Sequence, residues 1–191
     1  MTRTGIFGGS FNPIHNGHIS LAFQIISRGA LDEIWFMVSP QNPLKHRASL
    51  VTDKIRFKMV ETALREYPAL KACDYELHLP QPSYTWDTLN SMSVDFPNNK
   101  LVLLIGADNW QCIRQWYKYE DIISNYDIII YPRRGYCISQ RELPKNVSFI
   151  DSDLFDISST EIRQRIKKKE GIEGLVPPGV ERIIKEETLY E

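Results

Sequence analysis

Residues 5–18 read Gly-Ile-Phe-Gly-Gly-Ser-Phe-Asn-Pro-Ile-His-Asn-Gly-His and join the end of a predicted strand to the start of a predicted helix. Gly8 and Gly9 have no Cβ, so the backbone can turn tightly and approach an anion closely. His15 and His18 fall on the first helical turn, where unpaired N–H groups and the helix dipole attract negative charge. Positions three apart share one helix face, so both imidazoles can reach the same phosphate. The stretch predicts a nucleotide phosphate site, although a lone H-x-G-H would favour a plain turn with two surface histidines.

The composition indicates a small protein with one main domain. The chain has 191 residues, of which 42% are hydrophobic and 25% charged, which fits one unit over residues 1–191 with a C-terminal helical portion at about 157–191. The net charge of −1 argues against a protein that coats a polyanion, so nucleic acid is not expected as a partner. The start shows no signal peptide, and no apolar stretch is long enough to cross a membrane.

The cysteines carry little functional signal. Cys73, Cys112 and Cys137 are odd in number and lack the close spacing of a zinc site or a redox motif. Reduced thiols in the cytoplasm are their simplest interpretation. We therefore expect a cytoplasmic protein, and the sequence leaves its oligomeric state open.

Strand and helix patterns alternate along the chain. The predicted strands cover 2–7, Glu33–Val38, 71–77, Leu101–Ile105, Tyr126–Tyr131 and 147–150. The predicted helices cover His15–Ser27, Thr52–Glu66, 84–96, 159–169 and 178–187, with a further short helical region ending near Ser124. In the first helix the predicted buried face carries Ile19, Ala22, Phe23 and Ile26, and Gly29 closes the helix. This alternation predicts an α/β fold with a doubly wound parallel sheet.

The candidate functional segments all follow predicted strands. Ligands of open parallel sheets bind outside the carboxyl ends of the strands, at the point where the strand order reverses. The segments that follow strands here are Gly8–His18, Ser39–Lys45, Gly106–Asp108 and Pro132–Gly135. One cleft at this edge of the sheet can gather all of them.

A second phosphate signal lies near the other end of the chain. Residues 157–163 read Ile-Ser-Ser-Thr-Glu-Ile-Arg, which places three hydroxyl side chains at a predicted helix start and Arg163 one turn later. This arrangement suits a triphosphate, and a well-capped surface helix is the alternative. The common P-loop pattern and the G-x-G-x-x-G pattern are both absent from the sequence, which disfavours a P-loop protein and a dinucleotide dehydrogenase.

Together these motifs resemble a known enzyme family. Gly8–Pro13 with His15–His18, and Ile157–Arg163, are similar to the motifs of the nucleotidyltransferase superfamily that has an H-x-G-H signature. Within it the chain resembles the bacterial nicotinate-nucleotide adenylyltransferases, because Ser83–Leu89, Gly106–Asp108, Trp116–Tyr117 and Leu175–Pro177 match that family's inner motifs in order. The resemblance covers nearly the full length and implies a Rossmann-like nucleotidyltransferase fold.

The resemblance implies adenylyl transfer from ATP to nicotinate mononucleotide, which gives deamido-NAD and pyrophosphate in NAD biosynthesis. Positioning and charge stabilisation are then the main tasks, because the attacking phosphate oxygen is already ionised. The implied catalytic residues are His15, His18, Lys45 and Arg163. The implied ATP-binding residues are Gly8, Gly9, Ser10, Phe11, His15, His18, Gly106, Asp108, Ile157, Ser158, Ser159, Thr160 and Arg163. Mg²⁺ is expected to bridge phosphate oxygens, with no dedicated protein metal site.

The implied acceptor-binding residues are Lys45, Tyr84, Thr85, Trp116, Tyr117 and Arg133. Trp116 would stack on the pyridine ring, and core packing is the alternative for this side chain. A nicotinate carboxylate only accepts hydrogen bonds, so main-chain N–H groups near Thr85 and Tyr117 would favour the acid over the amide. The roles of Arg134 and Lys167 stay open.

The sequence departs from the family pattern at two places. Asn12 stands where many relatives carry aspartate, and the loop Pro40–His46 lacks the usual Pro-Pro-His-Lys form around Lys45. Three rival interpretations stay open. These are a nicotinamide mononucleotide or dual-specificity adenylyltransferase, a pantetheine-phosphate adenylyltransferase, and a non-catalytic nucleotide sensor.

Overall fold

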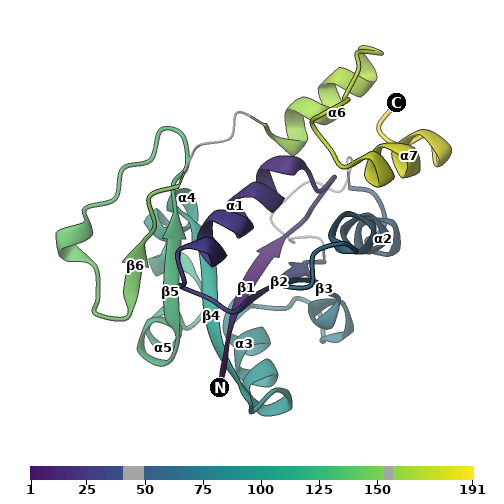
Figure 1. Cartoon of the computed structure of the whole chain (residues 1–191). Helices are drawn as coiled ribbons and strands as arrows, with labels where there is room; N and C mark the ends of the chain where they lie inside the picture. Colours follow the sequence, from purple (N-terminus) through teal and green to yellow (C-terminus); the bar gives the residue numbers. More distant parts are fainter. Residues whose placement is uncertain (41–49, 153–156) are drawn as a thin grey trace.

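The computed structural model describes residues 1–40, 50–152 and 157–191, and this part of the chain forms a parallel α/β sandwich. Its six-stranded sheet has the order β3-β2-β1-β4-β5-β6, with all pairings parallel (Figure 1). The strands are β1 (Thr2–Gly9), β2 (Glu33–Val38), β3 (Leu70–Cys73), β4 (Asn99–Gly106), β5 (Asp127–Tyr131) and β6 (Val147–Phe149). The predicted doubly wound α/β fold is confirmed, and the strand order reverses between β1 and β4.

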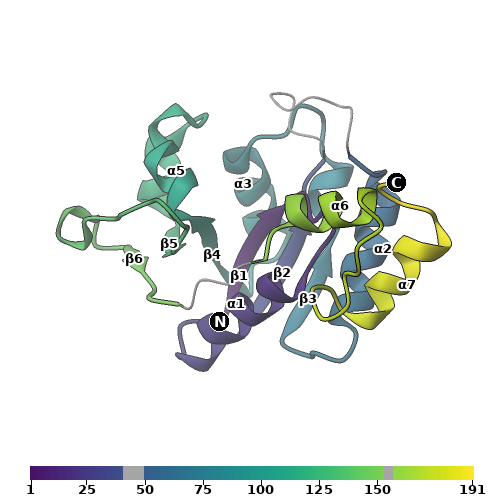
Figure 2. The same cartoon turned by 90° about the horizontal axis from the view of Figure 1, so that it is seen from above.

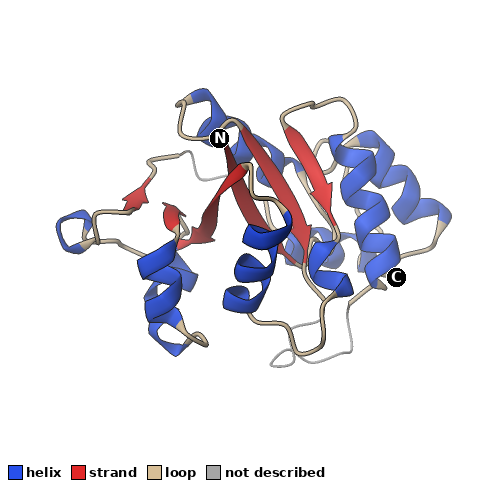
Figure 3. Ribbon diagram, turned by 90° about the horizontal axis from the view of Figure 1, so that it is seen from below, coloured by secondary structure: helices blue, strands red, loops and turns tan. Residues whose placement is uncertain are grey.

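Helices connect successive strands and cover both faces of the sheet (Figure 3). The α-helices are α1 (Asn16–Ser27), α2 (Asp53–Leu64), α3 (Thr85–Asp95), α4 (Ala107–Gln111), α5 (Tyr119–Asn125), α6 (Ser159–Lys167) and α7 (Pro178–Glu186). Short 3-10 helices are η2 (Tyr75–His78), η3 (Ile113–Gln115) and η4 (Gln140–Glu142). None of the helices among the described residues is long and apolar enough to span a membrane.

The two faces of the sheet carry separate apolar cores. Consecutive residues of a strand point to opposite faces, so Phe7 joins the core beneath α1, α2 and α7, whereas Ile6 joins the core beneath α3 and α5. Figure 2 shows α1 on one side of the sheet and α3 and α5 on the other. With both faces covered, β4 reads as the continuous apolar run expected of a central parallel strand.

Two local predictions were wrong in part: Ile19 and Ala22 are buried as expected, but Phe23 is not, and the third predicted strand is too long. In α1 the buried apolar side chains are Ile19, Leu21, Ala22 and Ile25, while Phe23 is 39% exposed. This helix is apolar on nearly every side, so periodicity alone could not choose the face that packs on the sheet. The strand predicted at 71–77 ends at Cys73, and Tyr75–His78 instead form η2.

The turn from β1 into α1 determines the position of the site. Gly9 lies so close to the Phe11 ring that an added Cβ would stand 2.9 Å from it, and Phe11 itself has a φ of 42°. Only glycine fits at position 9 without a shift of this ring. The chain then enters α1 with His15 at the N-cap position in extended backbone conformation.

Candidate active site

Two adjoining cavities open at the carboxyl ends of the strands. The first, here the histidine cavity, has a volume of about 340 Å³ and is lined by His15, His18, Asp108 and Arg133. The second, the tryptophan cavity, has a volume of about 440 Å³ and is lined by Thr85 and Trp116 together with the loop after β1. Tyr131, at the end of β5, lines both. The site therefore has two compartments that meet where parallel-sheet enzymes bind ligands.

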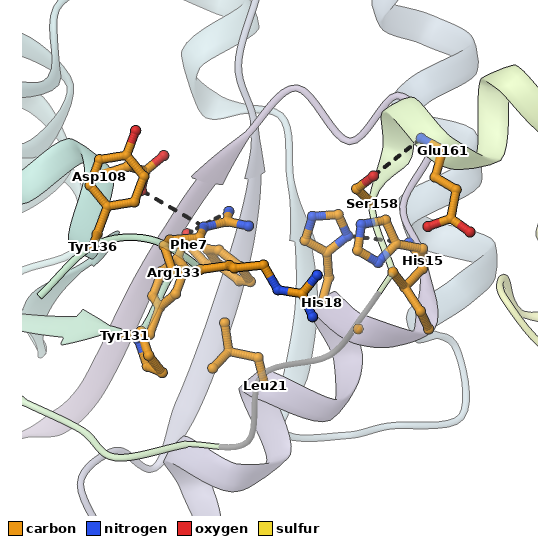
Figure 4. Close-up of a pocket in the computed structure, with 14 residues that line it drawn as sticks. Phe7, His15, His18, Leu21, Asp108, Tyr131, Arg133, Tyr136, Ser158 and Glu161 are labelled. Carbon is orange, nitrogen blue, oxygen red and sulfur yellow. Dashed lines mark hydrogen bonds and ion pairs between the residues drawn. The ribbon is translucent and has the colours of Figure 1, made fainter.

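The two histidines of the H-x-G-H motif form a stacked pair at the start of α1. Their ring centroids are 3.6 Å apart and their planes differ by 28°, and Figure 4 shows the two rings side by side. The backbone N–H of His15 donates to Nδ1 of His18 over 3.2 Å. A neutral His18 ring therefore carries its proton on Nε2, which leaves that N–H as a donor.

Both imidazoles are neutral at physiological pH. Burial, assisted by the nearby cation of Arg133, lowers the pKa of His15 to about 3. Burial also lowers the pKa of His18, with smaller contributions from His15 and Arg133. Nδ1 of His15 is buried and has no hydrogen-bond partner in the described part of the chain. The pair thus offers neutral hydrogen-bonding groups to a ligand, and an anion bound against it would raise both pKa values.

Arg133 and Asp108 face each other across the histidine cavity. Nε of Arg133 lies 3.8 Å from Oδ1 of Asp108, and the Arg133 guanidinium also stands 5.2 Å from the Tyr131 ring centroid. Oδ1 of Asp108 is buried without a hydrogen bond from any described residue. A Cβ on Gly106 would lie 2.3 Å from Oδ1 of Asp108 and 3.0 Å from the Arg133 side chain. Because Gly106 has no Cβ, there is room beside it for the carboxylate of Asp108 and the side chain of Arg133 to approach each other.

Side chains of α2 and α6 donate hydrogen bonds to backbone carbonyl groups of the loop after β1. Arg56, which is fully buried on α2, donates to the carbonyl of Ser10 and to the carboxylate of Asp53. Nη1 of Arg163 donates to the carbonyl of Asn12 over 2.8 Å. The Ser159 hydroxyl donates to the carbonyl of Pro13 over 2.9 Å. Side chains from α2 and α6 thereby fix the loop that lies between the two cavities.

The tryptophan cavity also contains a half-buried carboxylate. Glu76 of η2 accepts hydrogen bonds from the hydroxyls of Ser39, at 2.8 Å, and Ser83, at 2.9 Å. Burial raises the pKa of Glu76, and the two serine hydrogen bonds oppose that shift. Glu76 links the end of β2 to the segment that precedes α3, and so supports the wall that carries Thr85.

Most of the predicted site residues meet at these cavities. His15, His18, Asp108, Arg133, Ile157 and Ser158 line the histidine cavity. Gly8, Gly9, Ser10, Thr85, Trp116, Ser159, Thr160 and Arg163 line the tryptophan cavity. Phe11 is buried behind the histidines, with its ring 5.1 Å from that of His18. Lys45 lies outside the described residues.

Three residues predicted to bind the acceptor do not line the tryptophan cavity, namely Tyr84, Tyr117 and Arg133. Arg133 and its neighbour Arg134 line the histidine cavity. The side chains of Tyr84 and Tyr117 line neither cavity; they are exposed and pack against each other with ring centroids 5.0 Å apart. The main-chain contribution predicted around Thr85 and Tyr117 does not depend on where these rings lie.

The sequence analysis missed Tyr131 and Glu76. Tyr131 is the last residue of β5 and adjoins the predicted segment Pro132–Gly135, so the rule on strand ends could have included it. Glu76 was assigned to a strand, and only the turn into η2 brings its carboxylate to the cavity.

Comparison with known proteins agrees with this geometry. The family model for cytidylyltransferase-like proteins matches residues 6–165. A Bacteroides fragilis protein named probable nicotinate-nucleotide adenylyltransferase is 43% identical over 187 residues, covering 98% of this chain and 93% of that protein. The Bacillus subtilis nicotinate-nucleotide adenylyltransferase is 35% identical over 191 residues, covering 100% of both chains.

The fold comparison gives a consistent result. The solved structure of Plasmodium falciparum nicotinic acid mononucleotide adenylyltransferase, complexed with NaAD, matches with a TM-score of 0.82 and 23% identity. The match covers 100% of this chain and 98% of that one. The H-x-G-H pair at a strand end, the second motif at the start of α6 and the full-length relatives lead to one conclusion: the chain belongs to the cytidylyltransferase-like family and, within it, to the nicotinate-nucleotide adenylyltransferases.

Proposed function

We propose that this protein transfers the adenylyl group of ATP to nicotinate mononucleotide and releases deamido-NAD and pyrophosphate, as a step of NAD biosynthesis. Relatives that carry this name cover almost the whole chain. The observation that carries the proposal is the pair of cavities that share Tyr131, one built around His15 and His18 and the other around Trp116. Two adjoining compartments suit a reaction that joins two nucleotides.

In this reaction an oxygen of the mononucleotide phosphate attacks the α-phosphorus of ATP. A new P–O bond forms, the bond from the α-phosphorus to the bridging oxygen breaks, and pyrophosphate leaves with that electron pair. The attacking oxygen is already ionised near neutral pH, so the protein need supply no general base. Two neutral imidazoles are consistent with that requirement. Catalysis then rests on alignment and on stabilising the charge that develops on the phosphate oxygens.

His18 is the proposed donor to the α-phosphate. Its Nδ1 is engaged by the His15 backbone, so the Nε2–H is the group that a phosphate oxygen can accept from. His15, stacked on it, restricts the ring's orientation. Arg133 lines the same cavity and would add positive charge beside the reacting phosphates.

The triphosphate is proposed to lie between the loop after β1 and the start of α6. Gly8, Gly9 and Ser10 allow close backbone approach, while Thr160 offers a hydroxyl beside the unpaired N–H groups of a helix start. The Ser159 hydroxyl donates its one proton to the carbonyl of Pro13, so Ser159 would contribute through its backbone N–H. Arg163 and, from outside the described residues, Lys45 would hold the β- and γ-phosphates. Asp108 is proposed to accept from ribose hydroxyls or to lie near the metal.

Mg²⁺ is the proposed cofactor. The buried Oδ1 of Asp108 has no hydrogen-bond donor among the described residues, and a carboxylate oxygen is a ligand type that Mg²⁺ accepts. No group of three or more metal-binding side chains occurs in residues 1–40, 50–152 and 157–191. These residues fit an ion that would be held mainly by ATP phosphates and water, to which Asp108 would offer a carboxylate oxygen. Such an ion would neutralise charge on the phosphates as pyrophosphate leaves.

The part of the tryptophan cavity formed by Thr85 and Trp116 is proposed to bind the mononucleotide, while the loop after β1 and the start of α6 line the part proposed for the triphosphate. The Trp116 indole, half-buried in its wall, offers a flat face for a pyridine ring. Main-chain N–H groups around Thr85 and Tyr117 are proposed to bind the nicotinate carboxylate. A nicotinamide amide brings its own N–H donors to those groups, which would leave a donor facing a donor.

The proposed partners are these small molecules alone, and the cytoplasm is the proposed location. The described cysteines are free thiols, which suits a reducing compartment. We also propose that residues 1–191 act as one domain, because α6 and α7 share a core with α1 and α2.

The test is pyrophosphate release from ATP and Mg²⁺ with nicotinate mononucleotide, nicotinamide mononucleotide and phosphopantetheine as separate acceptors. Strong preference for nicotinate mononucleotide is the expected result. Equal use of the amide would contradict the selectivity argument, and release only with phosphopantetheine would contradict the substrate. Nucleotide binding without turnover on any acceptor would favour a sensor.

A further inference from the structure

Asn12 forms hydrogen bonds with three separate parts of the chain: the segment before α2, helix α6 and the segment after α7. Its side-chain Oδ1 accepts hydrogen bonds from the hydroxyl of Tyr190, at 2.8 Å, and from the backbone N–H of Val51, at 3.3 Å. Its carbonyl accepts from Nη1 of Arg163. Asn12 is only 3% exposed, so the oxygen atoms that accept these bonds lie in a buried residue. The loss of one would leave a buried oxygen of Asn12 with fewer hydrogen bonds.

Asn12 sits in the middle of the loop that the proposed function assigns to the triphosphate. It lies between Gly8–Ser10 and the histidine pair, and it lines the tryptophan cavity together with Arg163. A shift of Asn12 would therefore move the backbone on both sides. The same shift would break the bond that orients Arg163.

Tyr190 reaches this loop from the far end of the chain. The segment after α7 turns back at Thr188, whose φ is 51°, and the N–H of Leu189 donates to the carbonyl of Ile184. Figures 1 and 2 both show the carboxyl end of the chain beside α6. Because of this turn, Tyr190 lies in the wall of a cleft that is also lined by Val51, Arg163 and Lys167.

The hydroxyl of Tyr190 acts as a donor at all working pH values. Burial raises its pKa, and the nearby cations Arg163 and Arg56 only partly oppose the shift. A phenol has a single proton to donate, and here that proton is directed to Asn12. Tyr190 is therefore placed to fix the loop and not to bind the nucleotide itself.

We propose that Tyr190 is a positioning residue for the ATP site, which it stabilises by holding Asn12 in the loop after β1. The proposal rests on the proposed function in one respect, namely that this loop binds the triphosphate. An aspartate at position 12 would keep the acceptor oxygen for these two hydrogen bonds but would add negative charge beside the proposed phosphates.

The test is Tyr190→Phe, which removes the hydroxyl and keeps the ring. The dissociation constant of a non-hydrolysable ATP analogue, measured by calorimetry, should rise about five- to tenfold, the range expected when one buried hydrogen bond is lost. The KM for ATP should rise by a similar factor, while kcat and the KM for the mononucleotide stay within about twofold of the original values. A merely structural role would lower the melting temperature without this split.

Tyr67→Phe is the matched control, because Tyr67 packs against Phe23 and lines neither cavity. Asn12→Ala should weaken analogue binding, and adding Tyr190→Phe to it should cost nothing further, since the shared bond is already gone. Additive effects, or equal losses in the control, would overturn the proposal.

Two further measurements keep the inference separate from the proposed reaction. In an Asn12→Asp background the acceptor atom is kept, so Tyr190→Phe should again weaken analogue binding; an unchanged dissociation constant there would overturn the proposal. If the unaltered protein transfers nothing to nicotinate mononucleotide yet its analogue binding still depends on Tyr190, the proposed reaction fails and the positioning role stands.

Discussion

His15 and His18 are coupled through their backbone as well as through their rings. The N–H of His15 donates to Nδ1 of His18 over 3.2 Å, and the ring centroids lie 3.6 Å apart. One hydrogen bond therefore starts α1 and also sets the tautomer of the second imidazole. Because burial keeps both rings neutral, the pair can align a phosphate through directed hydrogen bonds without serving as a base.

His18→Ala should lower kcat by about 10²- to 10³-fold, the loss typical of removing one donor to a developing oxyanion. The fold should hold, because the Phe7 and Phe11 rings that pack against His18 stay in the core. Steady-state pyrophosphate release measures the loss of kcat, and a melting curve followed by circular dichroism shows whether the fold is retained. His78→Ala is the matched control, since His78 is exposed and pairs with Asp74, the residue just before η2. A turnover in His18→Ala equal to that of the control would reject the role of His18.

The melting temperature should fall as the pH is lowered from 7 toward 5. The ordinary pKa of histidine is 6.5, and in the folded protein the pKa of His15 is lowered to about 3, with that of His18 lowered as well. Between these values the unfolded chain binds more protons than the folded one, so acid favours unfolding. His15→Gln should make the curve flatter over this range. A variant curve parallel to that of the unaltered protein would contradict the shifted pKa of His15.

Gly106→Ala should lower kcat/KM by about 10²-fold while leaving the sheet intact, because a misplacement of about 1 Å at the site has that order of effect. The new Cβ would stand 2.3 Å from Oδ1 of Asp108 and 3.0 Å from Arg133, and both must move. Gly171→Ala is the matched control, since its Cβ would meet nothing within 4 Å. Kinetics and melting temperatures of the two variants give the comparison, and equal kcat/KM values would rule out a need for the glycine.

The sequence predicted the parts of the fold that depend on strong local patterns. Glu33–Val38 was assigned with the bounds that β2 has, because an apolar run between turn residues has one plausible structure. The gathering of strand-end segments followed from the parallel sheet alone. The buried face of α1 was predicted only in part. Ile19 and Ala22 are buried and Phe23 is not, because apolar residues surround that helix and packing on the sheet determines which of them are covered.

Contacts between distant segments lay beyond the reach of local patterns. Nothing near Tyr190 in the sequence indicates that its hydroxyl meets Asn12, 178 positions away. Likewise, Glu76 reaches the tryptophan cavity only because η2 interrupts the expected strand. Such side chains depend on tertiary packing, so the sequence revealed the motifs of the candidate site but not the supporting contacts of Tyr190 and Glu76.

Trp116→Ala should raise the KM for nicotinate mononucleotide about tenfold and leave the KM for ATP within about twofold, because stacking of a base on an aromatic ring contributes about 1–3 kcal/mol. Trp116 comes from the segment between α4 and α5, whereas the residues proposed for the triphosphate come from the loop after β1 and the start of α6, so its removal should act mainly on the mononucleotide. Trp110→Ala is the control, since Trp110 is similarly half-buried yet lines neither cavity. Initial rates measured over both substrate concentrations separate the two KM values. A rise in the ATP value alone, or an equal rise in both, would mean that the indole does not bind the pyridine ring.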